Sequence, residues 1–329
     1  MIFPLPGSLQ RQGRGLLTLI YIFMVTTEIA DKIKRLEEKY AAMGQDLSSY
    51  LDGLLYADYL TYWDYIQLDV LLNLQHPRTP IPDENIFIIY HQITELYFKL
   101  TLQAIEQISF APELTVAGFK TQLKRINNYF RNLINSFEIM VDGMDKDQFL
   151  QFRMALLPAS GFQSGQFRKI EICSTELVNL VYQPQRPGLI GAELDKILDQ
   201  IYWRSGATEL STGKKTLTLR QFEKKYMGEF LQLATRYKDN NIRAQYRRLS
   251  SADQQELIPL LKEYDTNINV RWPLMHYKSA VRYLNRKPED IAATGGTNWQ
   301  KYLPPRNKRI IFFPELWTEE ELDNWGKEL

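Results

Sequence analysis

The dominant pattern along the chain is a repeat of apolar residues every three to four positions, which is the period of an amphipathic α-helix. The stretch SSYLDGLLYADYLTYWDYIQLDVLLNLQ, residues 48–75, keeps such a stripe and is rich in aromatic residues. Few stretches alternate with a period of two, so no β-sheet is expected. The pattern therefore predicts an all-α fold, built as a bundle of long helices.

A second helix is predicted over residues 84–108, ENIFIIYHQITELYFKLTLQAIEQI. The segment before it, HPRTPIPDEN, contains three prolines that break the preceding helix, and Asp83 is expected to cap the new one. Apolar residues nearly surround this helix, so we expect it to lie centrally in the bundle.

Further core helices are expected over residues 112–141, 145–157, 159–181 and 252–287. The segment QPQRPG, residues 183–188, is a candidate hinge, and the chain after it is more charged and less apolar as far as residue 251. This shift predicts a main helical domain formed by residues 24–182 and 252–329. Residues 183–251 are then a smaller helical insert.

The N-terminal stretch RQGRGLLTLIYIFMV, residues 11–25, superficially resembles a signal peptide because two arginines precede an apolar run. The run is too short to cross a bilayer as a helix, and no small-residue cleavage site follows it. The favoured interpretation is that residues 1–23 are a non-native or disordered extension and that the folded chain begins near Met24. A secretory signal is the alternative.

Composition narrows the class of protein. The 329 residues are 44% hydrophobic, which is enough for a sizeable core, and 40 basic side chains face 39 acidic ones. This balance gives no electrostatic case for binding nucleic acid or an acidic membrane surface. The single Cys173 excludes an intrachain disulfide and a cysteine-rich zinc site. One thiol suits a reducing compartment, so a cytoplasmic location is expected.

His276, in RWPLMHYKSAV (residues 271–281), is the first candidate for chemistry. Its helix is expected to begin at Pro273, and the small residues Ser279 and Ala280 lie one turn away on the same face. Small residues there leave room for a flat group such as haem, for which a neutral imidazole is a common axial ligand. The commoner alternative is a hydrogen-bonded histidine without a metal.

His91 shares a helix face with Phe87 and Glu95, each four residues away. A polar ring and a carboxylate on an otherwise apolar helix suggest a buried polar site. The alternative, favoured by this stretch alone, is a histidine that hydrogen-bonds to a carboxylate or to the backbone inside the core.

Arg153 lies on the apolar face of a helix, near Phe149 and Leu156. A buried guanidinium needs a partner, and its planar fork matches a carboxylate. That carboxylate belongs either to a substrate or, more commonly, to an internal acidic residue. The loop that follows contains Ser160 and Gly161, which can contact a ligand or simply end one helix and cap the next.

A glycine-rich loop, ATGGTNW, spans residues 293–299. It lacks the phosphate-loop motif and does not follow a strand, so a phosphate site is not expected. The loop is either a lid over a site or an ordinary turn.

Taken together, five motifs resemble the tryptophan 2,3-dioxygenase family, whose members are haem enzymes that open the indole ring of L-tryptophan. The resemblance extends from about Leu51 to Tyr302. Its motifs are YWDYIQLDVLLNLQ, DENIFIIYHQITELYFKL, FLQFRMALLPASGFQSGQFRKIE, RWPLMHY and TGG, which occur here in the family's order.

The resemblance implies a role for each candidate residue. His276 matches the axial ligand of the haem iron, and His91 matches the distal catalytic histidine that faces the indole N–H. The implied cofactor is one haem b per subunit, ferrous in the active form, and the implied pocket lies in the helical core. The implied substrate-binding residues are Phe87, Phe149 and Leu156 around the indole, Arg153 at the carboxylate, Ser160 near the haem and Thr294 in the covering loop.

In the family, two tyrosines of one subunit complete the pocket of a neighbouring subunit, and Tyr62 and Tyr65 match them. This implies a homotetramer. The implied reaction adds O2 across the indole C2–C3 bond to give N-formylkynurenine. The alternative is a related haem enzyme that oxidises another indole or a modified tryptophan. It is kept because GGTNWQ departs from the family's usual string after Thr294, and Gly165 stands where a large apolar residue is commoner.

Overall fold

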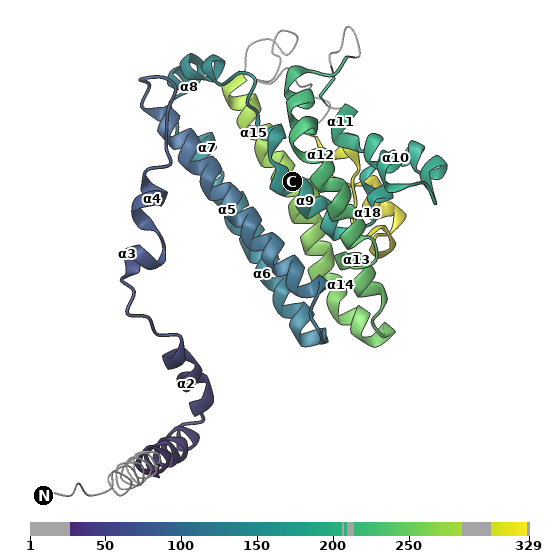
Figure 1. Ribbon diagram of the computed structural model, residues 1–329. Coiled ribbons are helices and arrows are strands. Elements are labelled where there is room, and N and C mark those ends of the chain that lie inside the picture. The colour runs from purple at the N-terminus through teal and green to yellow at the C-terminus, as the bar shows by residue number, and fades with distance from the viewer. Residues whose placement is uncertain (1–26, 206, 209–213, 285–303, 328–329) are drawn as a thin grey trace, which may run out of the picture. The chain divides into compact units, whose positions relative to one another are not determined.

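The computed structural model describes residues 27–205, 207–208, 214–284 and 304–327 (Figure 1). The chain falls into two units, residues 1–74 and residues 75–329, and each is considered by itself. Within the described residues the fold is all-α, as predicted. The only β pairing among the described residues is two isolated bridges, Val181 with Ile201 and Thr208 with Lys215.

The first unit contains a helix over residues 27–42, followed by α2 (Leu47–Leu55), α3 (Tyr62–Tyr65) and α4 (Leu68–Leu72). The predicted stripe over residues 48–75 is therefore divided among three short helices. Thr61 caps α3 by accepting a hydrogen bond from the backbone N–H of Asp64. Large apolar side chains remain exposed here, and Tyr59 is 99% exposed.

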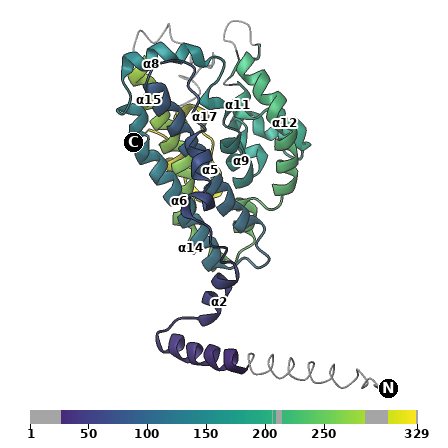
Figure 2. The same ribbon diagram turned by 60° about the vertical axis from the view of Figure 1, so that its left-hand side comes forward.

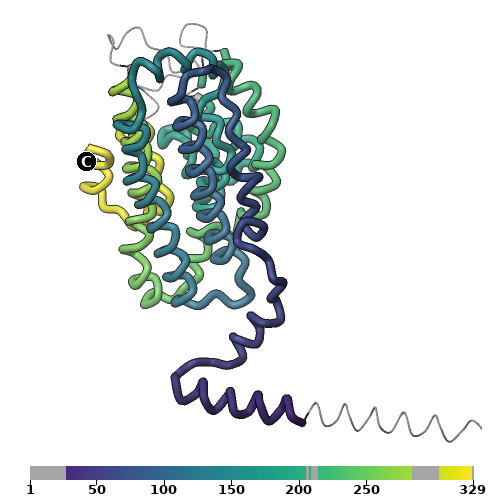
Figure 3. Tube along the Cα trace, turned by 90° about the vertical axis from the view of Figure 1, so that its left-hand side faces the viewer, coloured from purple at the N-terminus to yellow at the C-terminus, as the bar shows by residue number. Residues whose placement is uncertain are grey.

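The second unit is organised around long helices that run alongside one another: α5 (Asp83–Ser109), α6 (Val116–Ser136) and α14 (Ser251–Thr266) (Figures 1 and 3). Helix α14 continues through a π-helical turn (Asn267–Arg271) into α15 (Trp272–Leu284).

The expected helix start at Pro273 is wrong, because the chain is helical from Ser251 to Leu284. The π turn ends two residues before this proline, whose missing N–H interrupts the α-helical hydrogen-bond ladder there.

Another long helix, α12 (Leu217–Tyr237), and several shorter ones complete the second unit. The predicted helix over residues 112–141 divides at Phe137 into α6 and α7 (Glu138–Val141). The predicted helix over residues 145–157 becomes α8 (Lys146–Phe152) and a 3-10 turn (Arg153–Leu156). The others are α9 (Gly165–Ser174), α10 (Leu194–Asp199), α11 (Tyr202–Ser205), α13 (Ile242–Arg247), α17 (Pro305–Lys308) and α18 (Glu319–Asp323), with 3-10 turns at Gly161–Gln163, Leu177–Leu180, Gln183–Leu189 and Pro314–Leu316.

The candidate hinge over residues 183–188 lies in one of these 3-10 turns, and α10 to α13 lie in the predicted insert. The insert itself stays a prediction. None of the described helices combines the length and the apolar character that a membrane-spanning helix needs.

Helix α5 begins differently from the prediction. Asp83 is its first residue rather than its cap, and its carboxylate accepts a hydrogen bond from the backbone N–H of Asp145, 2.6 Å away. The next residue, Glu84, is fully buried and accepts hydrogen bonds from the backbone N–H groups of Arg78 and Thr79. Against the effect of burial, these bonds lower the pKa of Glu84. An ionised Glu84 thus orders the proline-rich segment before α5.

Helix α5 is also less central than expected. It packs on α6 and α9, but a stripe of apolar side chains on its remaining face is 37–48% exposed, formed by Ile89, Ile93, Leu96 and Leu100. These positions are three or four residues apart, so they form one continuous apolar face of the helix.

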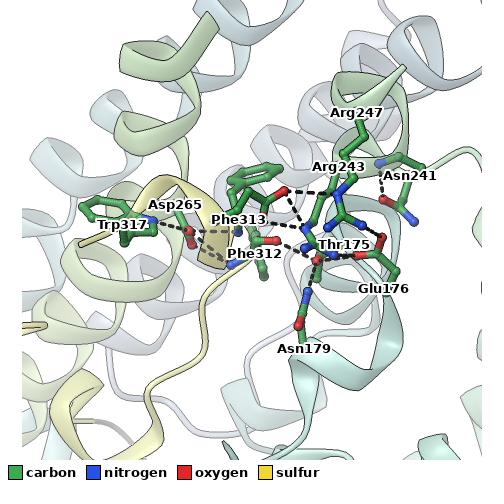
Figure 4. A network of polar contacts seen from close by, with 12 residues as sticks. Thr175, Glu176, Asn179, Asn241, Arg243, Arg247, Asp265, Phe312, Phe313 and Trp317 are labelled. Atoms are coloured by element: carbon green, nitrogen blue, oxygen red, sulfur yellow. Dashed lines mark hydrogen bonds and ion pairs between the residues drawn. The ribbon is translucent and has the colours of Figure 1, made fainter. Parts of the chain in front are cut away.

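A buried carboxylate fastens the C-terminal segment to the end of α14 (Figure 4). Asp265 is fully buried and accepts hydrogen bonds from the backbone N–H groups of Phe312 and Phe313 and from the indole N–H of Trp317, at 3.0 to 3.2 Å. The side-chain amide of Asn269 donates a further bond. Burial raises the pKa of Asp265 to about 6, although these bonds act in the opposite direction.

The same segment has a second attachment (Figure 4). Thr175 donates a hydrogen bond from its hydroxyl to the carbonyl of Phe312, 2.7 Å away. The guanidinium of Arg243 bridges Glu176 and Glu315 and so ties the segment to α13. Residues 310–317 are therefore held from both sides by polar contacts.

We expect Asp265→Ala to lower the free energy of unfolding by about 3 to 5 kcal/mol, because three N–H donors of the C-terminal segment lose their buried acceptor. Asp265→Asn keeps one acceptor oxygen, so its loss is expected to be smaller. Chemical denaturation at pH 7.5 would measure both, with the exposed Asp323→Ala as the control. An alanine variant as stable as the wild type would contradict this account.

The contribution of Asp265 to the stability of the fold depends on pH with a defined sign. The pKa of Asp265 in the fold, about 6, lies above its ordinary value of 3.8, so the folded state binds this proton more tightly than the unfolded state. Stability from this group is therefore largest at low pH and falls as the pH rises through this window. The stability difference between the wild type and Asp265→Ala should shrink accordingly.

Candidate functional site

Two histidines from different helices define the centre of the candidate site. His91 lies on α5 and His276 on α15, and the two rings are near enough that the charge of one lowers the pKa of the other. Aromatic rings fill the space around them. Phe137 lies 4.5 Å from the ring of His276 and 5.7 Å from that of Tyr90, which in turn lies beside His91. The fold thus brings together two residues that are far apart in the sequence.

Both imidazoles are fixed in the same way by their own helices. The Nδ1 atom of His276 lies 3.0 Å from the carbonyl oxygen of Trp272, and that of His91 lies 2.7 Å from the carbonyl oxygen of Phe87. A carbonyl oxygen can only accept, so Nδ1 carries the proton in each ring. The lone pair of each Nε2 atom is left to bind a metal or to accept another hydrogen bond.

Burial keeps both rings uncharged. It lowers the pKa of His276 to about 4 and also lowers the pKa of His91, while the hydrogen bonds to the helix carbonyls oppose these shifts. The positive charge of Lys308 lowers the pKa of His276 further. Both histidines are therefore neutral near pH 7, which is the form in which imidazole binds a metal.

An aromatic wall joins the His91 side of the site to α8. The ring of Phe87 lies 4.1 Å from His91 and 6.3 Å from Phe149, and Phe149 lies 4.7 Å from Tyr283 on α15. Leu156, in the 3-10 turn after α8, packs against the same core. The structure thus groups the rings of Phe87 and Phe149 with His91, while their contact with a substrate stays a prediction.

Arg153 stands where α8 ends. It is the C-terminal cap of α8 and the first residue of the following 3-10 turn, and its backbone N–H donates to the carbonyl of Phe149. This geometry places it one turn after Phe149. Burial lowers the pKa of its guanidinium, but an arginine remains a cation at neutral pH.

Ser160 is an N-terminal cap, which was one of the two alternatives for its loop. Its hydroxyl oxygen accepts a hydrogen bond from the backbone N–H of Phe162. The side-chain oxygen of Gln163 accepts a hydrogen bond from the backbone N–H of Ser160. The cap uses the hydroxyl oxygen as an acceptor, so the hydroxyl proton can still be donated to a ligand.

The predicted residues of the second unit share one property. Each is partly accessible, neither fully buried nor fully exposed, although fully buried residues such as Phe152 lie among them. Partial access is what a binding site in a core requires of its lining. The residues are Phe87, His91, Phe149, Arg153, Leu156, Ser160 and His276.

Three predicted residues are not part of this group. Thr294 and its loop lie outside the described residues. Tyr62 and Tyr65 belong to α3 in the first unit, where their side chains are 69% and 75% exposed.

Sequence patterns missed two residues beside His276. Phe137 lies at the junction of α6 and α7, where periodicity marks it as one core residue among many. Lys308 ends α17 and is only 4% exposed, although a lysine is ordinarily a surface residue. The sequence signal that could have found it is its position two residues before the apolar run IIFF, residues 310–313.

The donor chemistry suits haem. In the described parts of the chain there is no group of three or more His, Cys, Asp or Glu side chains that could hold a metal ion. Haem needs only one protein ligand, because its own nitrogens supply four others, and a neutral imidazole with Nδ1 bonded to a carbonyl is a favourable one. His276 and His91 both meet that requirement.

Fold and site define a helical-bundle protein with a pair of neutral, partly buried histidines. Residues 54–180 match the family model described as tryptophan 2,3-dioxygenase. The tryptophan 2,3-dioxygenase of Ruegeria pomeroyi is 30% identical over 276 residues, which cover 80% of this chain and 92% of that protein. The one from a Bradyrhizobium strain is 30% identical over 271 residues, covering 78% and 91%. This chain belongs to the tryptophan 2,3-dioxygenase family.

Gly165 sets the approach of α12 to the start of α9, directly after the Ser160 loop. A Cβ atom at Gly165 would lie 2.6 Å from the ring of Tyr226 on α12. That ring stacks on Phe230 with a centroid separation of 5.6 Å, so it cannot move away easily. The glycine therefore allows a close helix contact on this side of the site.

We expect Gly165→Ala to destabilise the protein by about 1 to 3 kcal/mol, because the methyl group overlaps the Tyr226 ring. Gly228→Ala is the matched control, since Gly228 lies inside α12 with no atom near its missing Cβ. That change should stabilise the protein by about 0.5 to 1 kcal/mol. Thermal unfolding would measure both, and equal effects of the two changes would contradict the contact.

Proposed function

We propose that this chain is a haem-dependent dioxygenase that cleaves the C2–C3 bond of the indole ring of L-tryptophan with O2 to give N-formylkynurenine. The observation that carries the proposal is the pair of neutral histidines on α5 and α15, each with its Nε2 lone pair available. Membership of the tryptophan 2,3-dioxygenase family supports it.

His276 is proposed to hold the iron. Its Nδ1–H bond to the carbonyl of Trp272 fixes the ring and directs the Nε2 lone pair away from its own helix turn. Because the pKa of His276 is about 4, almost none of the imidazole is protonated near pH 7, so protons hardly compete with the metal for Nε2. Haem b, one per subunit and ferrous in the active form, would supply the binding and activation of O2.

His91 is proposed to orient the indole. Because its Nδ1 proton is donated to the carbonyl of Phe87, its Nε2 atom can only accept, and the indole N–H can only donate. A hydrogen bond between them fixes which edge of the indole ring faces the oxygen. Orientation of this kind lowers the barrier because the reacting atoms are already aligned.

The apolar wall is proposed to hold the indole ring and exclude water. Phe87 and Phe149 contribute rings that can pack on an aromatic substrate, and Leu156 adds apolar surface. A site without water protects reactive intermediates from side reactions.

Arg153 is proposed to bind the substrate carboxylate through two parallel hydrogen bonds. Its position one helical turn after Phe149, on the same side of the chain, supports this role. Ser160 is proposed to lie near the haem, and Thr294 to contact the amino-acid end of the substrate.

A homotetramer in the cytoplasm is proposed as the working form, with Tyr62 and Tyr65 completing a neighbouring subunit's pocket. Two exposed apolar surfaces support self-association: the stripe of Ile89, Ile93, Leu96 and Leu100 on α5, and the aromatic residues around α3 in the first unit. No nucleic acid or membrane partner is proposed.

We expect His276→Ala to weaken haem binding by at least about 100-fold, because even loss of a residue that orients a metal ligand costs 10- to 100-fold. The absorbance of the purified protein near the haem Soret band would measure this. Added imidazole should restore the band by occupying the space that the ring leaves. His76→Ala, at the exposed third histidine, is the control and should keep its haem. Full haem content in the His276 variant would rule out the assigned ligand.

We expect Arg153→Ala to lower kcat/KM for L-tryptophan by about 100- to 1000-fold, since a buried charged pair loses one partner. Activity with indoles that lack a carboxylate should change little, so the preference for tryptophan over tryptamine should fall. Arg153→Lys keeps the charge but loses the planar fork, and it should be intermediate. Product formation followed at the N-formylkynurenine absorbance gives these values.

The same assay tests the function as a whole. If the wild type binds haem but leaves tryptophan unchanged while converting another indole, the related activity replaces the proposed one. An unaltered substrate preference in Arg153→Ala would remove the carboxylate contact but leave the reaction in place.

A further inference from the structure

Lys308 places a charged ammonium group inside the core. The residue ends α17 and is 4% exposed. Its Nζ atom lies 5.0 Å from the centre of the Tyr202 ring, which gives a cation–π contact. Across residues 27–205, 207–208, 214–284 and 304–327, no carboxylate forms an ion pair with it, and it has no hydrogen bond to another side chain or to the backbone. Such a buried cation is costly without a counter-charge.

Glu171, whose charge acts on Lys308, already has other partners. Glu171 is fully buried and accepts a hydrogen bond from Arg168 at 3.0 Å and another from the hydroxyl of Tyr202. Arg168 and Glu171 therefore compensate each other. The charge of Lys308 is the third in this cluster, so the three residues together carry one net positive charge.

The ammonium keeps its proton in this environment. Burial lowers the pKa of Lys308 to about 8, the carboxylate of Glu171 opposes the shift, and Arg168 adds to it. A pKa of about 8 leaves most of the lysine charged at neutral pH. The group is therefore suited to an anionic partner, which the described part of the chain does not provide as an ion pair.

The location of Lys308 identifies that partner. Its ammonium group contacts the ring of Tyr202 on α11. The charge of Glu171 on α9 raises the pKa of Lys308, and the charge of Lys308 lowers the pKa of His276 on α15. Figure 2 shows α17 among the helices α15, α11 and α9. A group held by His276 would thus have Lys308 in its surroundings. Haem carries two propionate groups that are ionised at neutral pH, and a compact ammonium suits a single carboxylate oxygen.

We propose that the ammonium group of Lys308 binds a propionate of the haem that His276 holds, and so anchors the porphyrin on the side formed by α17, α11 and α9. This inference rests on the proposed function. It adds a residue outside the predicted set, and it gives the buried positive charge an anionic partner in the cofactor.

The test compares haem with its dimethyl ester, in which both propionates are uncharged. The full-length chain and Lys308→Met are each loaded with one or the other porphyrin. Transfer to an excess of an apo-globin, followed by absorbance, gives the rate of porphyrin loss. We expect Lys308→Met to lose haem about 10 to 100 times faster than the wild type, because one charge-assisted hydrogen bond is removed. The dimethyl ester should leave both proteins at the same rate.

Two further variants make the comparison specific. Lys308→Arg keeps the charge and should retain most of the difference between haem and its ester. Lys262→Met is the matched control, because Lys262 also lies over an aromatic ring, 4.7 Å from Trp317, but pairs with Glu321 at 2.6 Å. This control should not change the loss of either porphyrin.

Three results would overturn the inference while leaving the proposed function intact. Equal acceleration for haem and its ester would show that Lys308 only supports the fold. No acceleration for either would show that it does not reach the porphyrin. Unchanged haem loss with a raised KM for tryptophan would assign it to the substrate carboxylate. A wild-type chain that binds no porphyrin would instead overturn the proposed function, and this inference with it.

Discussion

The hydrogen bond between each imidazole Nδ1–H and the carbonyl one helical turn earlier is the interaction on which the site depends. It fixes the tautomer of His276 and of His91 and leaves each Nε2 lone pair available. Burial then keeps both rings neutral. The same local arrangement is thereby compatible with the two different roles proposed, iron binding for His276 and a hydrogen bond from the indole for His91. The difference comes from what surrounds each ring.

The environment of the His276 ring depends on how one long helix is fixed in the fold. Residues 251–284 form a continuous helix whose π turn lies between Asp265, which fastens the C-terminal segment, and His276. The C-terminal segment follows α17, so the chain that carries Lys308 is attached through its next residues to the helix that carries His276. The hydrogen bonds of Asp265 in Figure 4 thus connect the helix that carries His276 with the segment that follows Lys308, whose charge lowers the pKa of His276.

The sequence predicted much of the fold and part of the site. Helical periodicity identified α5, α6 and α14, and the spacing of Phe87 and His91 placed their rings together correctly. Local rules failed where a tertiary partner competed. Asp83 has the chemistry of a helix cap, but its carboxylate binds the backbone of Asp145 instead. Pro273 has the chemistry of a helix start, yet the preceding π turn carries the helix through it. The apolar stripe on α5 predicted burial, but part of it is exposed in the single chain.

The sequence by itself determined the all-α class, the helix periods and the identity of the candidate residues, because these follow from side chains that interact within a few positions of one another. Motif order also carried the family resemblance. Only the tertiary structure decided that His91 and His276 face a common region, that Phe137 lies against the second ring, and that Lys308 is buried near it. The first two relations join residues more than a hundred positions apart and the third joins residues about thirty apart, and no local period encodes such distances. They arise when buried helices pack and the polar groups among them must find partners.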